Sequence, residues 1–152
     1  MGTVRVKNAI ARGFYPSPVV RDITGASFRN LQWWAKNKIV SPPIENHLRL
    51  YNDVEVVEVM FMKELRRRRV ALSNVTKVLR CSRRQHLDVR LKQAMKDGRS
   101  LYLVTDGEKS SFLADRAEAL EILIEQKKKM FVICVSDYAE KLRSLRIKER
   151  WG

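Results

Sequence analysis

The stretch Ser17–Trp34, SPVVRDITGASFRNLQWW, holds two short amphipathic segments separated only by Gly25–Ser27. The serine–proline pair that opens it is typical of a helix start, with the serine as N-cap, and Gly25 is typical of a left-handed helix end. Ser27 has the character of a second N-cap. Two helices so close together predict a helix–turn–helix, which is either part of an ordinary core or a device that places one helix in a DNA groove.

The two tryptophans of the second segment are predicted to face opposite ways. The apolar residues that recur at helical spacing are Phe28, Leu31, Trp34 and Ala35. Since adjacent residues of a helix lie about 100° apart, Trp34 is predicted to be core. Trp33 falls on the face that carries Arg29 and Lys36, where its indole N–H could donate to a phosphate; the alternative is packing against the hairpin that follows.

The charge of the chain favours a DNA groove over an ordinary core. The 152 residues include 31 Lys and Arg against 17 Asp and Glu, a net charge of +14. Residues 1–84 hold 17 of the cationic side chains and 6 of the acidic ones, whereas residues 85–152 hold 14 and 11. An excess of this size usually has an anionic partner, and its asymmetry predicts that nucleic acid meets the N-terminal half.

Turn residues and periodicity predict an α+β fold that is mostly α, in three parts. Residues 1–13 are expected to form a basic N-terminal arm without periodicity, residues 14–84 an α-rich unit, and residues 85–152 a small α+β unit. Within the second part we expect a hairpin over Ile44–Tyr51, a helix over Asp53–Arg68 that begins with a capping box of Asn52 and Glu55, and a helix from Leu72. The arginine run that ends the Asp53 helix has a simple explanation, because cations are favoured at a helix C-terminus.

The C-terminal part mixes helices with short strands. It is predicted to contain a helix over residues 85–96, strands over 101–104 and 111–113, a helix from Asp115, a buried strand over Met130–Val135 and a last helix capped by Ser136 and Asp137. The apolar face expected for the Asp115 helix is Ala117, Leu120, Leu123 and Ile124.

Neither catalysis nor metal binding is expected. The two cysteines, Cys81 and Cys134, fall short of a closed metal site, and two isolated histidines suggest no nucleophile–base pair. We therefore expect no enzyme, no catalytic residue and no cofactor. The longest apolar run, Val54–Met62, is broken by acidic residues and is too short to span a bilayer. A signal peptide is not expected, because no apolar core follows the first basic residues. A cytoplasmic, nucleoid-associated protein without membrane contact is expected.

Residues 14–80 resemble the winged helix–turn–helix of the MerR family of bacterial transcription regulators. The stretches that carry the resemblance are ITGASFRNLQWW (23–34), VSPP (40–43), RLYNDVEV (49–56) and RRVALSNVTKVL (68–79), in the family's order and spacing. The chain departs from the family at Gln32, where Arg is usual, at the tryptophan pair, where a Tyr pair is usual, and at Lys38, where Gly is usual. We expect Asn37 to take the left-handed conformation in place of that glycine.

The resemblance implies which side chains touch DNA. Arg29 and Asn30 stand in the first turn of the recognition helix, where Arg can read guanine and Asn can read adenine. Arg49 and Tyr51 are expected to point out of one face of the wing, towards phosphate or the minor groove. The full set of expected DNA-binding residues is Ser27, Arg29, Asn30, Gln32, Trp33, Lys36, Arg49 and Tyr51.

The expected function is a sequence-specific, double-stranded DNA-binding transcription regulator that works as a homodimer through residues 85–152. A weak likeness of the C-terminal part to small domains of regulators and antitoxins leaves an alternative open. In that alternative, residues 85–152 bind a toxin and DNA binding serves autoregulation. A third reading is an architectural protein that shapes DNA.

Overall fold

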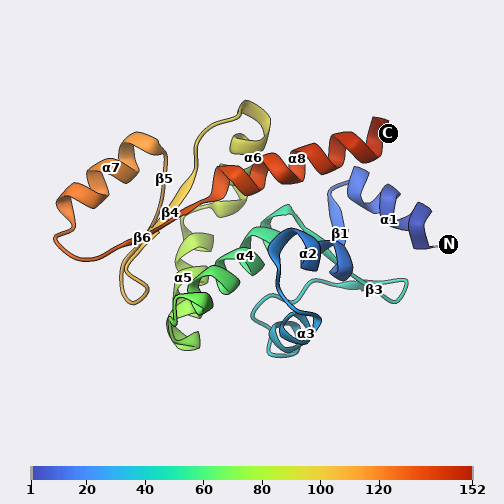
Figure 1. The fold of residues 1–152 in the computed structure, drawn as a ribbon, viewed down its shortest axis with the longest axis horizontal. Coiled ribbons are helices and arrows are strands. Elements are labelled where there is room, and N and C mark those ends of the chain that lie inside the picture. Colours follow the sequence, from blue (N-terminus) through green and yellow to red (C-terminus); the bar gives the residue numbers. More distant parts are fainter. Residues whose placement is uncertain (1, 152) are drawn as a thin grey trace. The chain divides into compact units, whose positions relative to one another are not determined.

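The computed structural model describes residues 2–151, and the side chains of residues 5–149. The fold is α+β and mostly helical, as predicted (Figure 1). It consists of two compact units: unit 1 holds the chain up to Lys63 together with the segment from Lys141 onward, and unit 2 holds Glu64–Glu140. The sequence does not predict that the chain returns to unit 1. Among the described residues no helix is both long and apolar enough to cross a membrane.

Unit 1 combines helices with one small antiparallel sheet. Its elements are α1 (Gly2–Ala11), β1 (Phe14–Pro16), α2 (Ser17–Thr24), α3 (Phe28–Lys36), β2 (Ile44–Glu45), β3 (Leu48–Asn52), most of α4 (Asp53–Arg67) and the later part of α8 (Val135–Trp151). The strand order is β1-β3-β2. The expected hairpin is therefore present, and β1 joins it as a third strand that the sequence did not predict.

Local signals explain where the helices of unit 1 begin and end. The predicted capping box of α4 is confirmed, because the backbone N–H groups of Asn52 and Glu55 each donate to the other residue's side chain at 2.9 Å. The predicted cap of α2 is wrong by one residue: Pro16 occupies the N-cap position, and Ser17 and Pro18 are the first helical residues. The proline still fits, since its missing N–H lies among the unpaired donors of the first turn.

The expectation of a non-periodic arm over residues 1–13 is wrong, because α1 covers most of it; Met1 lies outside the described residues. Ala9 and Ile10 are buried, while Arg5, Lys7 and Arg12 are exposed. Burial of this apolar pair stabilises a helix whose sequence has weak periodicity.

A partly buried carboxylate anchors α8 within unit 1. Asp53, at the start of α4, accepts a hydrogen bond from the Tyr15 hydroxyl at 2.7 Å and lies 3.3 Å from a guanidinium nitrogen of Arg146 in α8. Gly13 (φ +85°) lies against the same guanidinium, so a Cβ there would overlap it. Burial raises the pKa of Asp53, although the Tyr15 hydrogen bond and the Arg146 charge oppose the shift.

Unit 2 is a small sheet with helices packed on it. It holds the end of α4, α5 (Leu72–Arg84), α6 (Leu87–Asp97), β4 (Tyr102–Thr105), β5 (Ser111–Ala114), α7 (Arg116–Glu125), β6 (Phe131–Cys134) and the start of α8. The strand order is β5-β4-β6, and both pairings are antiparallel. Val75, Val78 and Leu79 form the buried face of α5, as predicted. The three strands also lie close to their expected positions.

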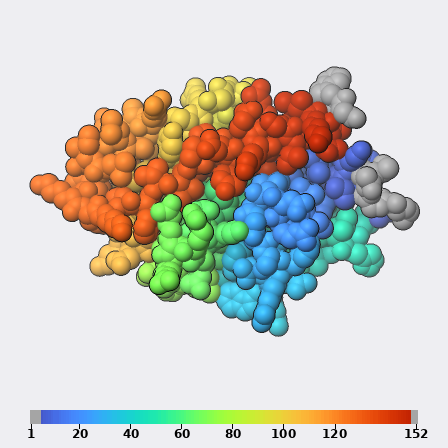
Figure 2. Space-filling model, viewed as in Figure 1, coloured from blue at the N-terminus to red at the C-terminus, as the bar shows by residue number. Residues whose placement is uncertain are grey.

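The predicted apolar face of α7 is wrong. The helix begins with the expected capping box of Asp115 and Glu118, but it buries Ala119 and half-buries Ile122 on the opposite side. Leu120, Leu123 and Ile124 are 60%, 41% and 71% exposed, and Ala117 is exposed as well. Figure 2 shows the orange segment that includes α7 with no other segment drawn over it on this face. The periodicity correctly indicates an apolar stripe, but this stripe faces away from the sheet.

The strand β6 is also less buried than predicted. Ile133 is buried, Phe131 and Cys134 are half-buried, and Val132 is 38% exposed. The physical reason is its place in the sheet: β6 lies at an edge and pairs with β4 on one side only.

Candidate nucleic-acid interface

The helix–turn–helix is held by contacts at its turn. Gly25 ends α2 in the left-handed conformation (φ +76°), and its N–H donates to Arg21. Thr24 donates to the carbonyl of Val20 at 2.7 Å and accepts from the N–H of Ala26 at 3.1 Å. From α4, the Lys63 ammonium donates to the carbonyl of Gly25 at 2.7 Å. The turn is therefore attached to the core helix, and the prediction that Gly25 is a left-handed cap is confirmed.

Replacing Gly25 by alanine should lower the free energy of unfolding by more than the same change at Gly98. Both glycines have positive φ, so alanine costs about 1–2 kcal/mol in backbone conformation at either site. At Gly25 the new Cβ would also overlap the Lys63 ammonium, whereas nothing lies within 4 Å of a Cβ at Gly98. Urea unfolding followed by circular dichroism measures both losses. Equal losses would mean that the Lys63 contact contributes nothing.

The helix α3 presents opposite kinds of side chain on its two sides. Its N-cap is Ser27, as predicted, with the hydroxyl accepting from the N–H of Asn30 at 3.1 Å. Leu31, Trp34 and Ala35 are buried. The predicted DNA-binding residues of the helix, Ser27, Arg29, Asn30, Gln32, Trp33 and Lys36, are all exposed. At 100° per residue, Arg29, Trp33 and Lys36 lie directly opposite the buried side.

The two tryptophans divide as predicted: Trp34 is 6% exposed and Trp33 is 47% exposed. Phe28, in contrast, does not join the buried stripe, because it is 39% exposed and lies under the Arg21 guanidinium at 4.5 Å. That cation–π contact offsets part of the exposure of its ring.

The end of α3 also differs from expectation. Asn37 has φ −89°, and its side chain donates to the carbonyl of Trp33 at 2.8 Å. The left-handed residue is Lys38 itself, with φ +57°. The expectation that Asn37 replaces the glycine is therefore wrong: Lys38 takes the glycine's conformation despite the steric cost of its Cβ.

The wing, residues 44–52, carries one of its two predicted contact residues on an accessible face. Asn46 and His47 form its turn with positive φ, and both are exposed. Arg49 is half-buried and donates to the carbonyl of Pro42 at 3.0 Å. Tyr51 is fully buried opposite Tyr15, so the expectation that it points outward with Arg49 is wrong. Alternation fails there because β3 is the central strand and is covered on both faces.

Sequence reasoning missed a cluster of polar side chains beside the wing. Arg5, Asn8 and Arg12 of α1 line a hollow of about 180 Å³ together with Glu45 and Asn46 of the wing. Val6, Ala9 and Ile10 stand at helical spacing, which is the signal that could have identified α1.

The arginine run of α4 is mostly used within unit 2. Arg66 donates to the carbonyl of Val70 at 3.0 Å, and Arg67 pairs with Glu64 at 3.1 Å. The Arg68 guanidinium lies 5.1 Å from the ring centre of Phe131. These contacts favour a structural role for the run over phosphate binding.

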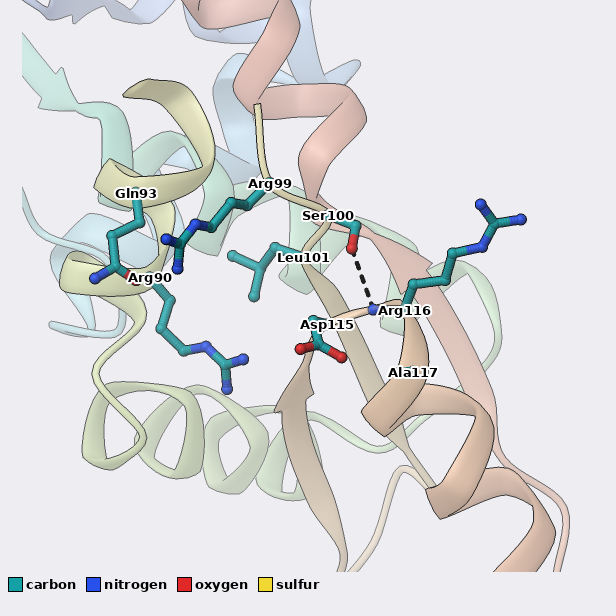
Figure 3. A pocket seen from close by; sticks show the side chains of 8 residues that line it. All are labelled: Arg90, Gln93, Arg99, Ser100, Leu101, Asp115, Arg116 and Ala117. Atoms are coloured by element: carbon teal, nitrogen blue, oxygen red, sulfur yellow. Dashed lines mark hydrogen bonds between the residues drawn. The ribbon is translucent and has the colours of Figure 1, made fainter. Parts of the chain in front are cut away.

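A pocket of about 430 Å³ lies at the N-terminal end of α7 in unit 2 (Figure 3). Its guanidinium groups are largely balanced by acids: Arg90 pairs with Glu118 at 3.1 Å, and Arg99 lies 3.7 Å from Asp97. Figure 3 shows the side chain of Arg116 pointing away from the cavity, while Asp115 lies at its rim. The pocket therefore offers little unopposed charge to an ionic ligand. Within the described residues no group of three or more His, Cys, Asp or Glu side chains could hold a metal ion.

Comparison with known proteins supports the geometry of the N-terminal region. Residues 15–81 match the family model for the MerR HTH family regulatory protein. No curated protein matches the chain. The matched residues include α2, its glycine turn, α3, the wing and α4, in the order that the sequence predicted. Residues 15–81, fewer than half of the 152 residues, are therefore similar to the helix–turn–helix of the MerR family of regulatory proteins.

Proposed function

We propose that this chain is a sequence-specific regulator that binds double-stranded DNA as a homodimer, in the cytoplasm and on the nucleoid. In this proposal α3 lies in the major groove and the wing contacts the adjacent backbone. The observation that carries it is the face of α3 formed by Arg29, Trp33 and Lys36, which is exposed opposite the buried side of the helix. A helix with one side fixed in the core and a cationic side free is what major-groove docking requires.

Base reading falls to the first turn of α3. Arg29 can donate to O6 and N7 of guanine, and Asn30 can pair with N6 and N7 of adenine. Their side chains project from the N-terminal part of the helix, which enters the groove in helix–turn–helix proteins. Gln32, one turn further from Arg29, is the third candidate for a base or phosphate contact.

Phosphate contacts fall to the flanks. Lys36 supplies charge, and the indole N–H of Trp33 supplies a donor beside it. Ser27 accepts the capping hydrogen bond at its oxygen, so its own O–H remains a donor for phosphate. One nitrogen of the Arg49 guanidinium donates to the carbonyl of Pro42, and its other N–H groups remain as donors for phosphates of the DNA backbone.

The first experiment is a titration of the full chain into labelled DNA from upstream of its own gene, beside a scrambled duplex, at two salt concentrations. Tight binding to the native fragment that survives higher salt supports sequence readout. Equal, salt-sensitive binding to both duplexes would contradict sequence-specific regulation and would indicate non-specific electrostatic binding to DNA.

Arg29 and Arg49 should give different phenotypes when replaced by alanine. Arg29→Ala should cost about 1–3 kcal/mol on the preferred site and relax discrimination at one base position. Arg49→Ala should weaken binding to all sequences alike and reduce the slope of log affinity against log salt by about one. Fluorescence anisotropy on single-base variants of the site measures both. The same sequence-independent loss for both variants would refute these roles.

The homodimer is placed in residues 85–152. α6 has 11 residues, which is short for a helix that must hold two copies together along its length. Two half-sites are needed because one helix–turn–helix reads only a few base pairs. The exposed apolar side chains of residues 85–140, which lie in unit 2, are therefore the part proposed to associate.

The antitoxin alternative rests on the same exposed side chains of α7. Leu120, Leu123 and Ile124 form an apolar stripe of the kind that marks protein–protein interfaces. If a toxin binds there, a protein encoded beside this chain should co-purify with it, and Leu120→Lys should release that protein. A homodimer that copurifies with no neighbour-encoded protein would contradict the alternative.

A further inference from the structure

The two edges of the unit 2 sheet differ in what covers them. On β5, the outward carbonyl of Ser111 accepts from Gln85 at 2.7 Å, and the outward N–H of Leu113 donates to the same side chain at 2.9 Å. The carbonyl of Leu113 accepts from Arg90. The side chains of Gln85, the C-cap of α5, and of Arg90 in α6 thus occupy the β5 edge and leave no room for another strand there.

The register identifies the backbone groups on the opposite edge. Because Ser111 and Leu113 point away from β4, alternation directs Phe112 and Ala114 towards it. Their partners on β4 are Val104 and Tyr102, so Leu103 and Thr105 point towards β6 and pair with Ile133 and Phe131. The N–H and C=O groups of Val132 and the N–H of Cys134 are therefore directed to the outer side of β6, where no strand of the described chain pairs with them. The C=O of Cys134 accepts the first helical hydrogen bond of α8, which begins at Val135.

We propose that the outer edge of β6 is the homodimer interface, where it pairs antiparallel with β6 of a second copy. This inference rests on the homodimer of the proposed function and names its surface. A two-fold axis through Ile133 places Val132 of each copy opposite Cys134 of the other copy. The outward N–H and C=O of Val132 then gain partners in both strands, the C=O of Cys134 accepts a second hydrogen bond beside the one from α8, and the two sheets become one of six strands.

The charges at the two ends of β6 are opposite in sign, so two antiparallel copies of this edge bring unlike charges together. Lys127 and Lys129 precede β6, and Asp137 follows it; all three are exposed. Antiparallel pairing reverses one strand, so the lysines of each copy lie beside Asp137 of the other, twice by symmetry. A parallel arrangement would place like charges together. The second copy is therefore the occupant that the charges favour.

Val132 and the apolar side chains of α7 lie on the same face of the unit 2 sheet, beside the proposed interface. Val132 is opposite Val104, which packs against Ala119 of α7, so Val132 and α7 share a face of the sheet. A two-fold axis normal to the sheet keeps both α7 helices on that face, with the two Val132 side chains between them. The exposed carboxylates of Glu121 and Glu125 on α7 disfavour DNA or an anionic membrane as the occupant of this face.

Val132→Pro tests the pairing directly. Proline removes the outward N–H, and the β4 pairing does not use that group; edge strands tolerate such a proline. Val132→Thr is the matched control, because it keeps the β-branched shape and the N–H. In analytical ultracentrifugation we expect the wild type and Val132→Thr to have the mass of two chains and Val132→Pro the mass of one. A dimeric Val132→Pro variant with an unchanged dissociation constant would overturn the proposal.

A charge exchange keeps the test decisive if the proline variant does not fold. Asp137→Lys, or Lys127→Glu with Lys129→Glu, should each weaken the dimer at least tenfold at low salt. Combining all three substitutions should restore it. Absence of restoration, with circular dichroism confirming that each variant is folded, would overturn the interface.

Measuring DNA affinity for a half-site and for the full site distinguishes failure of the β6 interface from failure of the proposed function. If β6 is the interface, Val132→Pro should bind a single half-site like the wild type but lose at least tenfold affinity for the full site. If every variant stays dimeric and binds the full site normally, the β6 interface is wrong and the regulator proposal stands. If the wild type is monomeric and does not distinguish its own upstream DNA from a scrambled duplex, both fail.

Discussion

Replacing Trp34 by alanine should lower the free energy of unfolding of the helix–turn–helix unit by about 3–5 kcal/mol. The side chain is 6% exposed and lies on the buried side of α3 with Leu31 and Ala35. Its removal leaves a cavity that the short helix cannot fill, because α3 is held at one end by its Ser27 cap and by the turn before it. Urea unfolding followed by far-ultraviolet circular dichroism measures the loss.

Trp33 is the matched control, since it is the same residue one position earlier in the same helix. It is 47% exposed, so Trp33→Ala removes much less buried area and should lower the free energy of unfolding by clearly less than Trp34→Ala does. If the proposed function holds, that variant should instead weaken DNA binding at all sequences. Equal losses of stability for the two variants would contradict the division of the helix into a core side and a DNA side.

The tryptophan pair illustrates what sequence alone can predict. Helical spacing distinguishes Trp33 from Trp34 because the periodicity of one short helix is a local property. The caps at Ser27, Asn52 and Asp115 are local as well, and each is present in the structure. Local signals and a resemblance to a known family were therefore enough for the helix–turn–helix.

The errors arise where tertiary context decides. Tyr51 alternates with Leu50 in the sequence, yet both are buried, because β1 adds a third strand and the sheet is covered on both faces at that point. The stripe on α7 has clear periodicity, but nothing in the sequence states which side of a helix meets a three-stranded sheet. The small side chain of Ala119 allows close approach of the helix, and the larger apolar residues remain outside.

The return of the chain to unit 1 could not be predicted either. It depends on Asp53 and Arg146, which lie far apart in the sequence and whose pairing has no periodic signature. Gly13 is the one local feature connected with this pairing, because a side chain at that position would overlap the Arg146 guanidinium.

Replacing Arg146 by methionine should therefore destabilise unit 1 by about 1.5–3 kcal/mol at neutral pH. Methionine keeps most of the apolar stem but removes the charge, which leaves the partly buried carboxylate of Asp53 with the Tyr15 hydroxyl as its partner. Lys148→Met is the control, because Lys148 is an exposed cation on the same helix. Chemical unfolding of the two variants and the wild type gives the comparison.

The stability that unit 1 loses in the Arg146→Met variant should grow as pH rises. Burial raises the pKa of Asp53 above its ordinary value of 3.8, and the Arg146 charge opposes that shift, so the variant raises the folded-state pKa further. A carboxyl group whose pKa is higher in the folded state binds more protons there, and stability falls as pH rises from the unfolded-state pKa through the folded-state pKa. The deficit should thus be small below pH 3.8, where Asp53 is protonated in both states, and complete at neutral pH. A deficit that is constant across this range would mean that Arg146 stabilises unit 1 through the packing of its stem and not through its charge.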